Sequence, residues 1–390
     1  MKTTVTSSGI WPNLSGLPAL EDIAALANVR DEKAHAVSFY FDLSSFSDMS
    51  HREEALTVKH LVNQAKSDFH LELEADKGLS KDLERVLKME DEIRETPAQL
   101  RAVFACGNEH IWREFDLPLR ESVGRLSVSR YFHLVPLLRA LESCTPHCVA
   151  IVEHDKARAF IVRGFEVQEM KDKLPSVDLS VQSDDSRVGW SHHLEGNVNE
   201  RAKAYMKELA IDIFRLVHEV RCRYLVVGCR EDVWAELEPE LAKTELAAMI
   251  AGHFHLSSFD LTPYGVLEAA KPVLAEKRRQ FYASVWESIE RKPSQSAVGV
   301  DQVLRSLESG RVHTLVLGNL SRADVNECAD CNKWWEKTSD TCVACGSSNM
   351  VTIPAEELLL RKALSTGAEI LTPEAEIAHL FGDVGAILRY

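Results

Sequence analysis

Residues 148–155, CVAIVEHD, begin with five consecutive apolar side chains and end in a polar turn. A short apolar run bounded by a turn predicts a buried β-strand. Two similar short segments follow at 157–162 and 165–170, and the turn residues Asp155-Lys156 and Arg163-Gly164 separate the three. We therefore predict three adjacent strands at this point of the chain.

Downstream of these strands the pattern alternates between helix and strand. Apolar residues at helical spacing predict a helix over about 200–220, and a second helix is predicted near 232–241. Between them residues 223–228, RYLVVG, predict a buried strand. Strands that alternate with helices are typical of an α/β sheet, so we predict the α/β class.

The flanking parts also mix the two kinds of element. The early part predicts a strand at 36–43, helix over about 52–94, a strand at 101–106 and an amphipathic segment at 131–141. The late part predicts helices over about 271–290, 301–309 and 355–365, strands at 314–317 and 369–371, and a final segment at 387–390. Since no internal repeat marks a boundary, we place domains at 1–143, 144–270 and 271–390, where the pattern changes.

The length and net charge of the chain limit the number of domains and the kinds of protein it can be. A chain of 390 residues suits two or three domains of ~100–150 residues each. With 45 Lys and Arg against 60 Asp and Glu, the net charge of −15 excludes a protein that coats nucleic acid through a global positive field. Any contact with RNA must be local. The first twenty residues lack the apolar core of a signal peptide, and no run of ~18–20 apolar residues occurs, so we expect a cytoplasmic protein without a membrane partner.

Four of the nine cysteines lie within eighteen residues near the C-terminus. Cys328 and Cys331 form one Cys-x2-Cys pair, and Cys342 and Cys345 form a second pair after ten intervening residues. Each pair can form a tight turn that points two thiolates at one ion, and two turns complete a closed tetrahedral site. We predict structural zinc in a ribbon over 326–350. An iron site, redox disulfides and four unrelated thiols are the alternatives.

A polar segment, 181–199, precedes the helix predicted at 200. It is rich in Ser, Asp, His, Gly and Asn, and few of its positions could enter a core, which predicts a loop. Near its end stand Gly196 and Asn197. Both residue types suit turns and helix caps, so a solvated connection that starts the helix is one interpretation of this segment.

The charge around this segment departs from the acidic average. Residues 196–230 carry seven Lys and Arg against four Asp and Glu. Local RNA contact by His192, His193, Arg201 and Lys203 is one interpretation, and charge pairs along an exposed helix face are the other. A metal or acid–base site at the two histidines with Glu195 is a further alternative.

Two segments near the C-terminus carry a family resemblance. Residues 297–317, AVGVDQVLRSLESGRVHTLVL, and the closing residues 367–371 and 381–390 resemble the C-terminal domain of archaeal and eukaryotic class-one peptide release factors and of Pelota. Residues 259–265, FDLTPYG, are similar to the linker that enters this domain. The resemblance implies a three-domain release-factor/Pelota-like architecture, whose third domain has the L7Ae-like fold, carries an inserted zinc ribbon and docks a translational GTPase.

The resemblance also gives the polar segment a role. The family's middle domain has a loop ending in Gly-Gly-Gln, followed four residues later by Arg and then by a long helix. Gly196 and Arg201 match this pattern, whereas Asn197 stands in place of Gln and Glu195 in place of the first Gly. In the family the glycines free the backbone and the Gln helps to position water at the peptidyl-tRNA ester. Asn197 keeps an amide that is one methylene shorter, and Glu195 adds negative charge beside an RNA-lined site.

The resemblance implies a translation factor of the release, rescue or hibernation class that binds the ribosomal A site. Its partners would be ribosomal RNA, P-site tRNA and the GTPase, with Gly196 and Asn197 near the peptidyl-transferase centre. The sequence diverges from the archaeal and eukaryotic factors, and in this it resembles the bacterial members of the superfamily, the Balon-like and bacterial release-factor-like proteins. Two versions remain, an active peptidyl-tRNA hydrolase and an occupant without catalysis, and the altered loop favours the occupant. A zinc-ribbon interaction protein that does not act on the ribosome is the third alternative.

Overall fold

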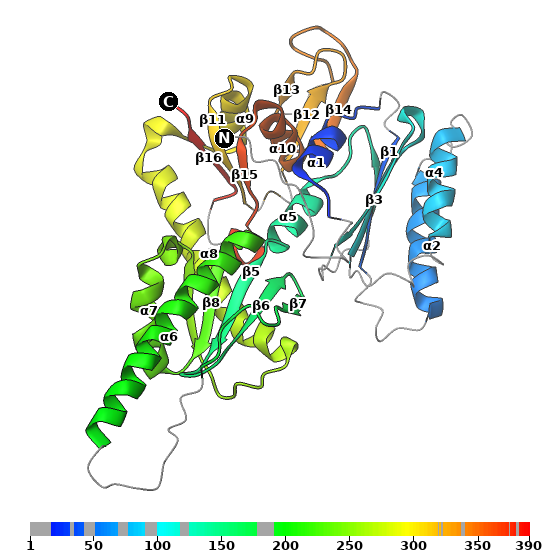
Figure 1. Ribbon diagram of the computed structural model, residues 1–390. Coiled ribbons are helices and arrows are strands. Elements are labelled where there is room, and N and C mark those ends of the chain that lie inside the picture. Colours follow the sequence, from blue (N-terminus) through cyan, green and yellow to red (C-terminus); the bar gives the residue numbers. More distant parts are fainter. Residues whose placement is uncertain are drawn as a thin grey trace. The chain divides into compact units, whose positions relative to one another are not determined.

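The structure is a computed structural model of residues 1–390. It describes residues 17–31, 35–42, 51–68, 77–89, 100–117, 125–177, 191–318, 320, 323–336, 340–373, 375–379 and 382–390. The chain forms two compact units (Figure 1). Unit 1 joins the residues up to Ser143 with those from Tyr282 onward, and unit 2 comprises Cys144–Phe281. The partition into three domains at 143 and 270 stays a prediction.

Unit 2 is built on a five-stranded sheet in the order β7-β6-β5-β8-β9. Its strands are β5 (His147–Val152), β6 (Ala157–Arg163), β7 (Glu166–Glu169), β8 (Tyr224–Cys229) and β9 (Ile250–His255). β5, β8 and β9 are parallel, and β6 and β7 extend the sheet in the antiparallel sense. Every residue of β5 and β8 is buried, as the continuous apolar runs predict for central parallel strands.

Helices pack on this sheet. They are α6 (Ser191–Val220), α7 (Glu231–Ala242), a 3-10 turn at Glu245–Ala248, and α8 (Pro263–Arg291), which continues into unit 1. The first part of α8 buries Val266, Ala270 and Leu274 against Val149 and Ile151 of β5. The prediction of an α/β sheet in this part of the chain is therefore confirmed.

The predicted start of α8 at residue 271 is wrong by eight residues, because the helix begins at Pro263. The Thr262 side chain caps it: its Oγ1 accepts the backbone N–H of Gly265 at 3.1 Å. Pro263 then occupies the first helical position, where no intrahelical N–H is needed. Pro272 lies inside the helix at an exposed position. None of the helices in the described ranges is long and apolar enough to cross a membrane.

The N-terminal part of unit 1 holds an antiparallel sheet in the order β3-β2-β1-β4. Its elements are α1 (Leu20–Ala27), β1 (Ala36–Asp42), α2 (His51–Asp68), α4 (Lys77–Lys88), β2 (Leu100–Cys106), a 3-10 turn at Gly107–Glu109, β3 (Ile111–Leu117), β4 (Arg125–Ser129) and α5 (Val135–Ser143). α2 and α4 pack on one face of the sheet, where Val62 and Leu83 share a core with Phe39 and Val103.

The C-terminal part of unit 1 holds a second sheet in the order β10-β16-β11-β15. Its elements are a 3-10 turn at Pro293–Gln295, β10 (Ser296–Val298), α9 (Val300–Glu308), β11 (Val312–Leu317), α10 (Ala355–Thr366), β15 (Glu369–Leu371), α11 (Ala375–Ala378) and β16 (Val384–Leu388). Trp286 of α8 lies against β16 so closely that a Cβ on Gly385 would stand 2.9 Å from its ring. A glycine at this position lets the helix approach the sheet.

A small three-stranded antiparallel sheet is inserted between β11 and α10. Its strands are β12 (Asp324–Cys328), β13 (Trp334–Trp335) and β14 (Met350–Pro354), in the order β13-β12-β14. The insertion spans the segment 326–350 in which the cysteine spacing predicts a ribbon.

Candidate functional site

The four cysteines predicted as metal ligands meet in one cluster. Cys328 ends β12, Cys331 follows in the next turn, and Cys342 and Cys345 come from the turn that precedes β14. The four Sγ atoms all lie within 4.8 Å of one another. The Sγ atoms of Cys328 and Cys345 are 3.6 Å apart, and those of Cys331 and Cys342 are 3.4 Å apart. We call these four residues the cysteine cluster.

Two matching backbone turns hold the cluster. The N–H of Asn332 donates to the carbonyl of Cys328 at 2.9 Å, and the N–H of Gly346 donates to the carbonyl of Cys342 at 2.8 Å. In both turns the donor residue is left-handed, with φ of 58° at Asn332 and 76° at Gly346. Asn and Gly are the residue types that adopt this conformation most readily. The sequence therefore fixes both turns locally, one beside each Cys-x2-Cys pair.

The cluster fits a tetrahedral metal ion. A Zn–S bond of about 2.3 Å gives S–S edges of about 3.8 Å in a tetrahedron, close to the two observed separations. A disulfide would require about 2.05 Å, and the cysteines are free. Burial raises the pKa of Cys342, but hydrogen bonds from the Cys345 N–H and from the Cys345 and Cys331 thiols outweigh it and lower the pKa to about 6, whereas the pKa values of Cys331 and Cys345 are raised. A thiolate is the metal-binding form of cysteine.

The residues predicted as a catalytic loop lie in a helix. α6 begins at Ser191, so the predicted loop end at 199 and helix start at 200 are wrong by nine residues. No proline occurs between 191 and 200, and propagation of a formed helix adds one hydrogen bond for each residue fixed. That gain outweighs the cost of Gly196, about 1 kcal/mol relative to Ala. The rest of the predicted loop, 181–190, lies outside the described residues.

The side chains of His192, His193, Gly196 and Asn197 also fall outside the described part of the chain, so their roles stay predictions. Arg201 and Lys203 are exposed on the next turns of α6. Lys203 and the exposed Lys207 share one face of the helix at i,i+4, and neither makes an ion pair with another described residue.

Further along residues 196–230, two arginines form ion pairs with acidic residues. Arg215 lies 2.8 Å from Asp212, and Arg230 lies 2.6 Å from Asp232. Charge pairing along an exposed face therefore accounts for these two arginines, whereas local RNA contact by the start of α6 stays a prediction. The start of α6 presents lysines to solvent, whereas Arg215 and Arg230 are paired with neighbouring acids.

A buried histidine–carboxylate group was not predicted from the sequence. Glu357, in the first turn of α10, accepts the N–H groups of Leu134 at 3.0 Å and Val135 at 2.9 Å, and its Oε1 lies 2.6 Å from Nδ1 of His133. Glu356 lies beside them. Because Glu357 caps the start of α5 with both oxygens, we interpret this group as a structural clamp between α5 and α10. Its partners are more than 220 residues apart, so no local pattern could have indicated it.

His147 at the start of β5 is a second buried titratable group. Its ring stacks on Tyr224 at 5.5 Å between centroids. Burial, with the positive charges of Arg278 and Arg223, lowers the pKa of His147 to about 3. The histidine is therefore neutral at physiological pH and does not act as an acid–base group there.

Comparison with known protein families gives a match to the central part of the chain. Residues 133–275 match the model of "Bacterial archaeo-eukaryotic release factor family 10". The matched segment takes in the sheet of unit 2 and the whole of α6. Among curated proteins no match is found.

Several solved structures are similar to the chain at low identity. An archaeal translation termination factor, aRF1, is 17% identical over 94% of this chain and 96% of its own, with a TM-score of 0.23. Pelota of Archaeoglobus fulgidus is 14% identical over 98% of both chains, with a TM-score of 0.33. Dom34 of S. cerevisiae, a translation termination-like factor, is 11% identical over 75% of this chain and 79% of its own, with a TM-score of 0.41. These TM-scores are too low to support a functional argument from the solved structures. The functional proposal below therefore rests on the family match over residues 133–275.

Proposed function

We propose that this chain, a divergent bacterial-type member of the archaeo-eukaryotic release-factor and Pelota superfamily, acts on the ribosome as a translation factor of the release, rescue or hibernation class. The observation that carries the proposal is the family match over 133–275, the segment that contains α6. In this proposal the N-terminal end of α6 enters the A site and brings Gly196 and Asn197 toward the peptidyl-transferase centre.

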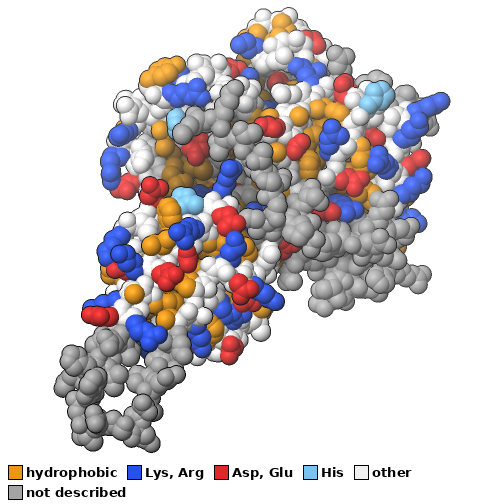
Figure 2. Space-filling model, viewed as in Figure 1, with side chains coloured by type: hydrophobic (Ala, Val, Ile, Leu, Met, Phe, Trp, Pro, Cys, Tyr) orange, Lys and Arg blue, Asp and Glu red, His pale blue; other side chains and the backbone are white. Residues whose placement is uncertain are grey.

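The surface charge is compatible with local rather than global RNA contact. On the face shown in Figure 2, Lys and Arg side chains are interspersed with Asp and Glu, as expected for a chain of net charge −15. Lys203 and Lys207 on α6 are exposed and have no described acidic partner, so they are the cations we assign to ribosomal RNA phosphates. His192, His193 and Arg201 are further candidates on the same helix.

Of the two versions, we favour an A-site occupant without hydrolysis. A Gly-Gly-Gln loop depends on backbone freedom, whereas the backbone at Gly196 and Asn197 is helical. The amide of Asn197 is also shorter than that of Gln, and Glu195 adds a negative charge. Positioning of the attacking water, which contributes strongly to such reactions, would be lost. An active peptidyl-tRNA hydrolase is the second candidate, favoured by the retained Gly196 and Arg201.

We further propose that the cysteine cluster holds structural zinc and that the C-terminal sheet is an L7Ae-like domain that docks a translational GTPase. Four protein thiolates leave no open coordination position, so the metal would supply stability rather than catalysis. The third candidate function is a zinc-ribbon interaction protein that does not act on the ribosome. In that case the protein would not co-sediment with ribosomes at low salt.

One experiment tests these versions together. Ribosomes with labelled formyl-methionyl initiator tRNA in the P site and an empty A site are mixed with the protein, and release and pelleting are measured in the same tube. Binding without release, unchanged by Asn197→Gln, supports the occupant. Release that Asn197→Ala abolishes and Asn197→Gln increases supports the hydrolase and refutes the occupant. Absence of both binding and release in this minimal system contradicts the ribosomal proposal.

A further inference from the structure

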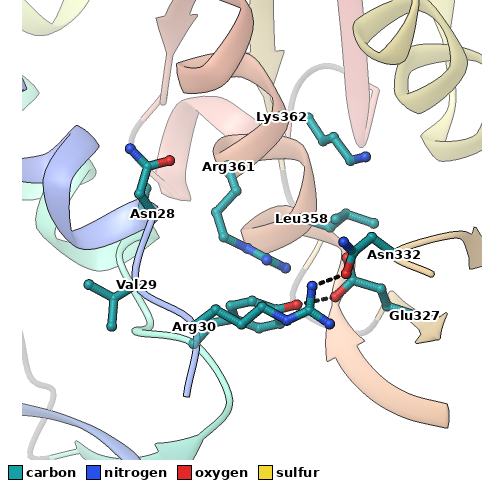
Figure 3. A pocket seen from close by; sticks show the side chains of 10 residues that line it. Asn28, Val29, Arg30, Glu327, Asn332, Leu358, Arg361 and Lys362 are labelled. Atoms are coloured by element: carbon teal, nitrogen blue, oxygen red, sulfur yellow. Dashed lines mark hydrogen bonds between the residues drawn. The ribbon is translucent and has the colours of Figure 1, made fainter. Parts of the chain in front are cut away.

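Unit 1 contains a small cavity of about 190 Å³ beside the inserted three-stranded sheet (Figure 3). It borders the cysteine cluster, because its lining residues Glu327 and Asn332 directly adjoin Cys328 and Cys331 in the chain. Its walls come from distant parts of the chain: residues 27–30 at the C-terminal end of α1 and just beyond it, Tyr131, Glu327 and Asn332 of the inserted segment, and Leu358, Arg361 and Lys362 of α10.

The lining is predominantly cationic, with Arg30, Arg361 and Lys362 against the single acid Glu327. Glu327 is already engaged, because its carboxylate accepts the hydroxyl hydrogen of Tyr131. Lys362 extends to Glu308, 3.1 Å away. In Figure 3 Arg30 points toward Asn332, whose side-chain oxygen accepts one of its hydrogen bonds.

Arg361 differs from the other cations because no described carboxylate pairs with it and two of its nitrogens lack a hydrogen-bond partner among the described residues. Its guanidinium stacks on the ring of Tyr131, with Cζ 3.4 Å from the ring centroid. Its Nε and one terminal nitrogen are buried, yet neither has a hydrogen-bond partner among the described residues, and no described carboxylate forms an ion pair with it. The two unpartnered nitrogens have almost no accessible surface, so what bears on the cavity is the positive charge of Arg361, which no described carboxylate offsets and an anion would compensate. The stacking also holds the planar fork of donors in one orientation, so little freedom would be lost on binding an anion.

We propose that this cavity binds the phosphate group of a ligand, with Arg361 as its principal contact. Arg30 lies in one wall of the cavity and Arg361 and Lys362 lie in another, and a phosphate offers several oxygen acceptors around one atom, whereas a carboxylate offers two in a plane. At about 190 Å³ the cavity is smaller than the ~300–1,000 Å³ of most sites for drug-sized ligands, which suits a phosphate group rather than a larger ligand.

Two sources of phosphate fit this chemistry, a free nucleotide and the backbone of RNA, and calorimetric titration of the full-length protein separates them. The titrants are inorganic phosphate, adenosine 5′-monophosphate and a 5′-phosphorylated RNA trinucleotide, all at equal ionic strength set with sodium chloride. Binding of the first two identifies a site for a free phosphate or nucleotide. Binding of the trinucleotide alone identifies a site for RNA phosphate. Either result supports the proposal if the variants below behave as expected.

The variants are Arg361→Gln, which removes the guanidinium, and Asn28→Asp, which adds a negative charge at the exposed rim of the cavity. Each is expected to weaken binding at least tenfold. The control, Arg305→Gln, removes an equal charge from an exposed, Asp301-paired position on α9 and should change the affinity less than twofold. Because Asn28 is exposed, its variant tests the site even if Arg361→Gln impairs folding. No binding of any titrant, or binding that neither variant weakens more than the control, overturns the proposal.

Discussion

The sharpest test of the ribosomal proposal concerns the two lysines on α6. Lys203 and Lys207 are exposed, lie one helical turn apart on the same face, and form no ion pair with a described residue. We predict that the double substitution Lys203→Gln and Lys207→Gln weakens ribosome binding most strongly at low salt. The reason is that each lysine placed on an RNA phosphate releases counterions when it binds.

The magnitude follows from the number of contacts. Each phosphate contact contributes a slope of about 0.7–0.9 in log affinity against log salt concentration, so two contacts contribute about 1.4–1.8. Over the fourfold change from 50 to 200 mM potassium chloride, the native protein should lose about seven- to twelvefold more affinity than the double variant. Pelleting with ribosomes across this salt range measures both slopes.

Lys243→Gln is the matched control. Lys243 is also an exposed lysine of unit 2, but it lies 2.6 Å from Glu240 and outside α6. Its substitution should leave the salt slope unchanged. The reasoning is refuted if the double variant and the control show the same slope as the native protein while all three bind the ribosome.

Three further predictions concern stability. If the cysteine cluster holds the proposed zinc, a chelator or Cys342→Ser should unfold the inserted sheet while leaving unit 2 folded, because so small a sheet would depend on the ion for its stability; metal analysis and hydrogen exchange check this, and an unchanged exchange pattern contradicts it. Glu357→Gln should lower the free energy of unfolding of unit 1 by about 3 kcal/mol, since it leaves the buried His133 and two N–H groups imperfectly paired; a loss below about 1 kcal/mol in denaturant unfolding argues against the clamp. His147 has a folded pKa of about 3, below its ordinary value of 6.5, so its contribution to stability is present above pH 6.5 and is lost as the pH falls toward 3. From pH 8 to pH 5 the native protein should lose about 2 kcal/mol more than His147→Gln, and equal losses in the two proteins refute the assignment.

Local sequence patterns were sufficient to predict an element where burial is uniform along its length. β5 and β8 are buried along their whole length, so their continuous apolar runs predict them within about one residue. The cysteine cluster is equally local, because each Cys-x2-Cys turn is closed by its own backbone hydrogen bond. β3 and β4 were missed for the opposite reason. They are the edge strands of their sheet, and most of their residues are only partly buried, which weakens the apolar pattern.

The sequence by itself determined the α/β class, the central strands and the four thiols of the cysteine cluster, since residue spacing and periodicity act over a few neighbouring positions. Only the tertiary structure brought Glu357 to the start of α5 and placed Arg361 over Tyr131. Those contacts join positions more than 200 residues apart, and no local pattern specifies which distant side chains meet when the chain closes on itself.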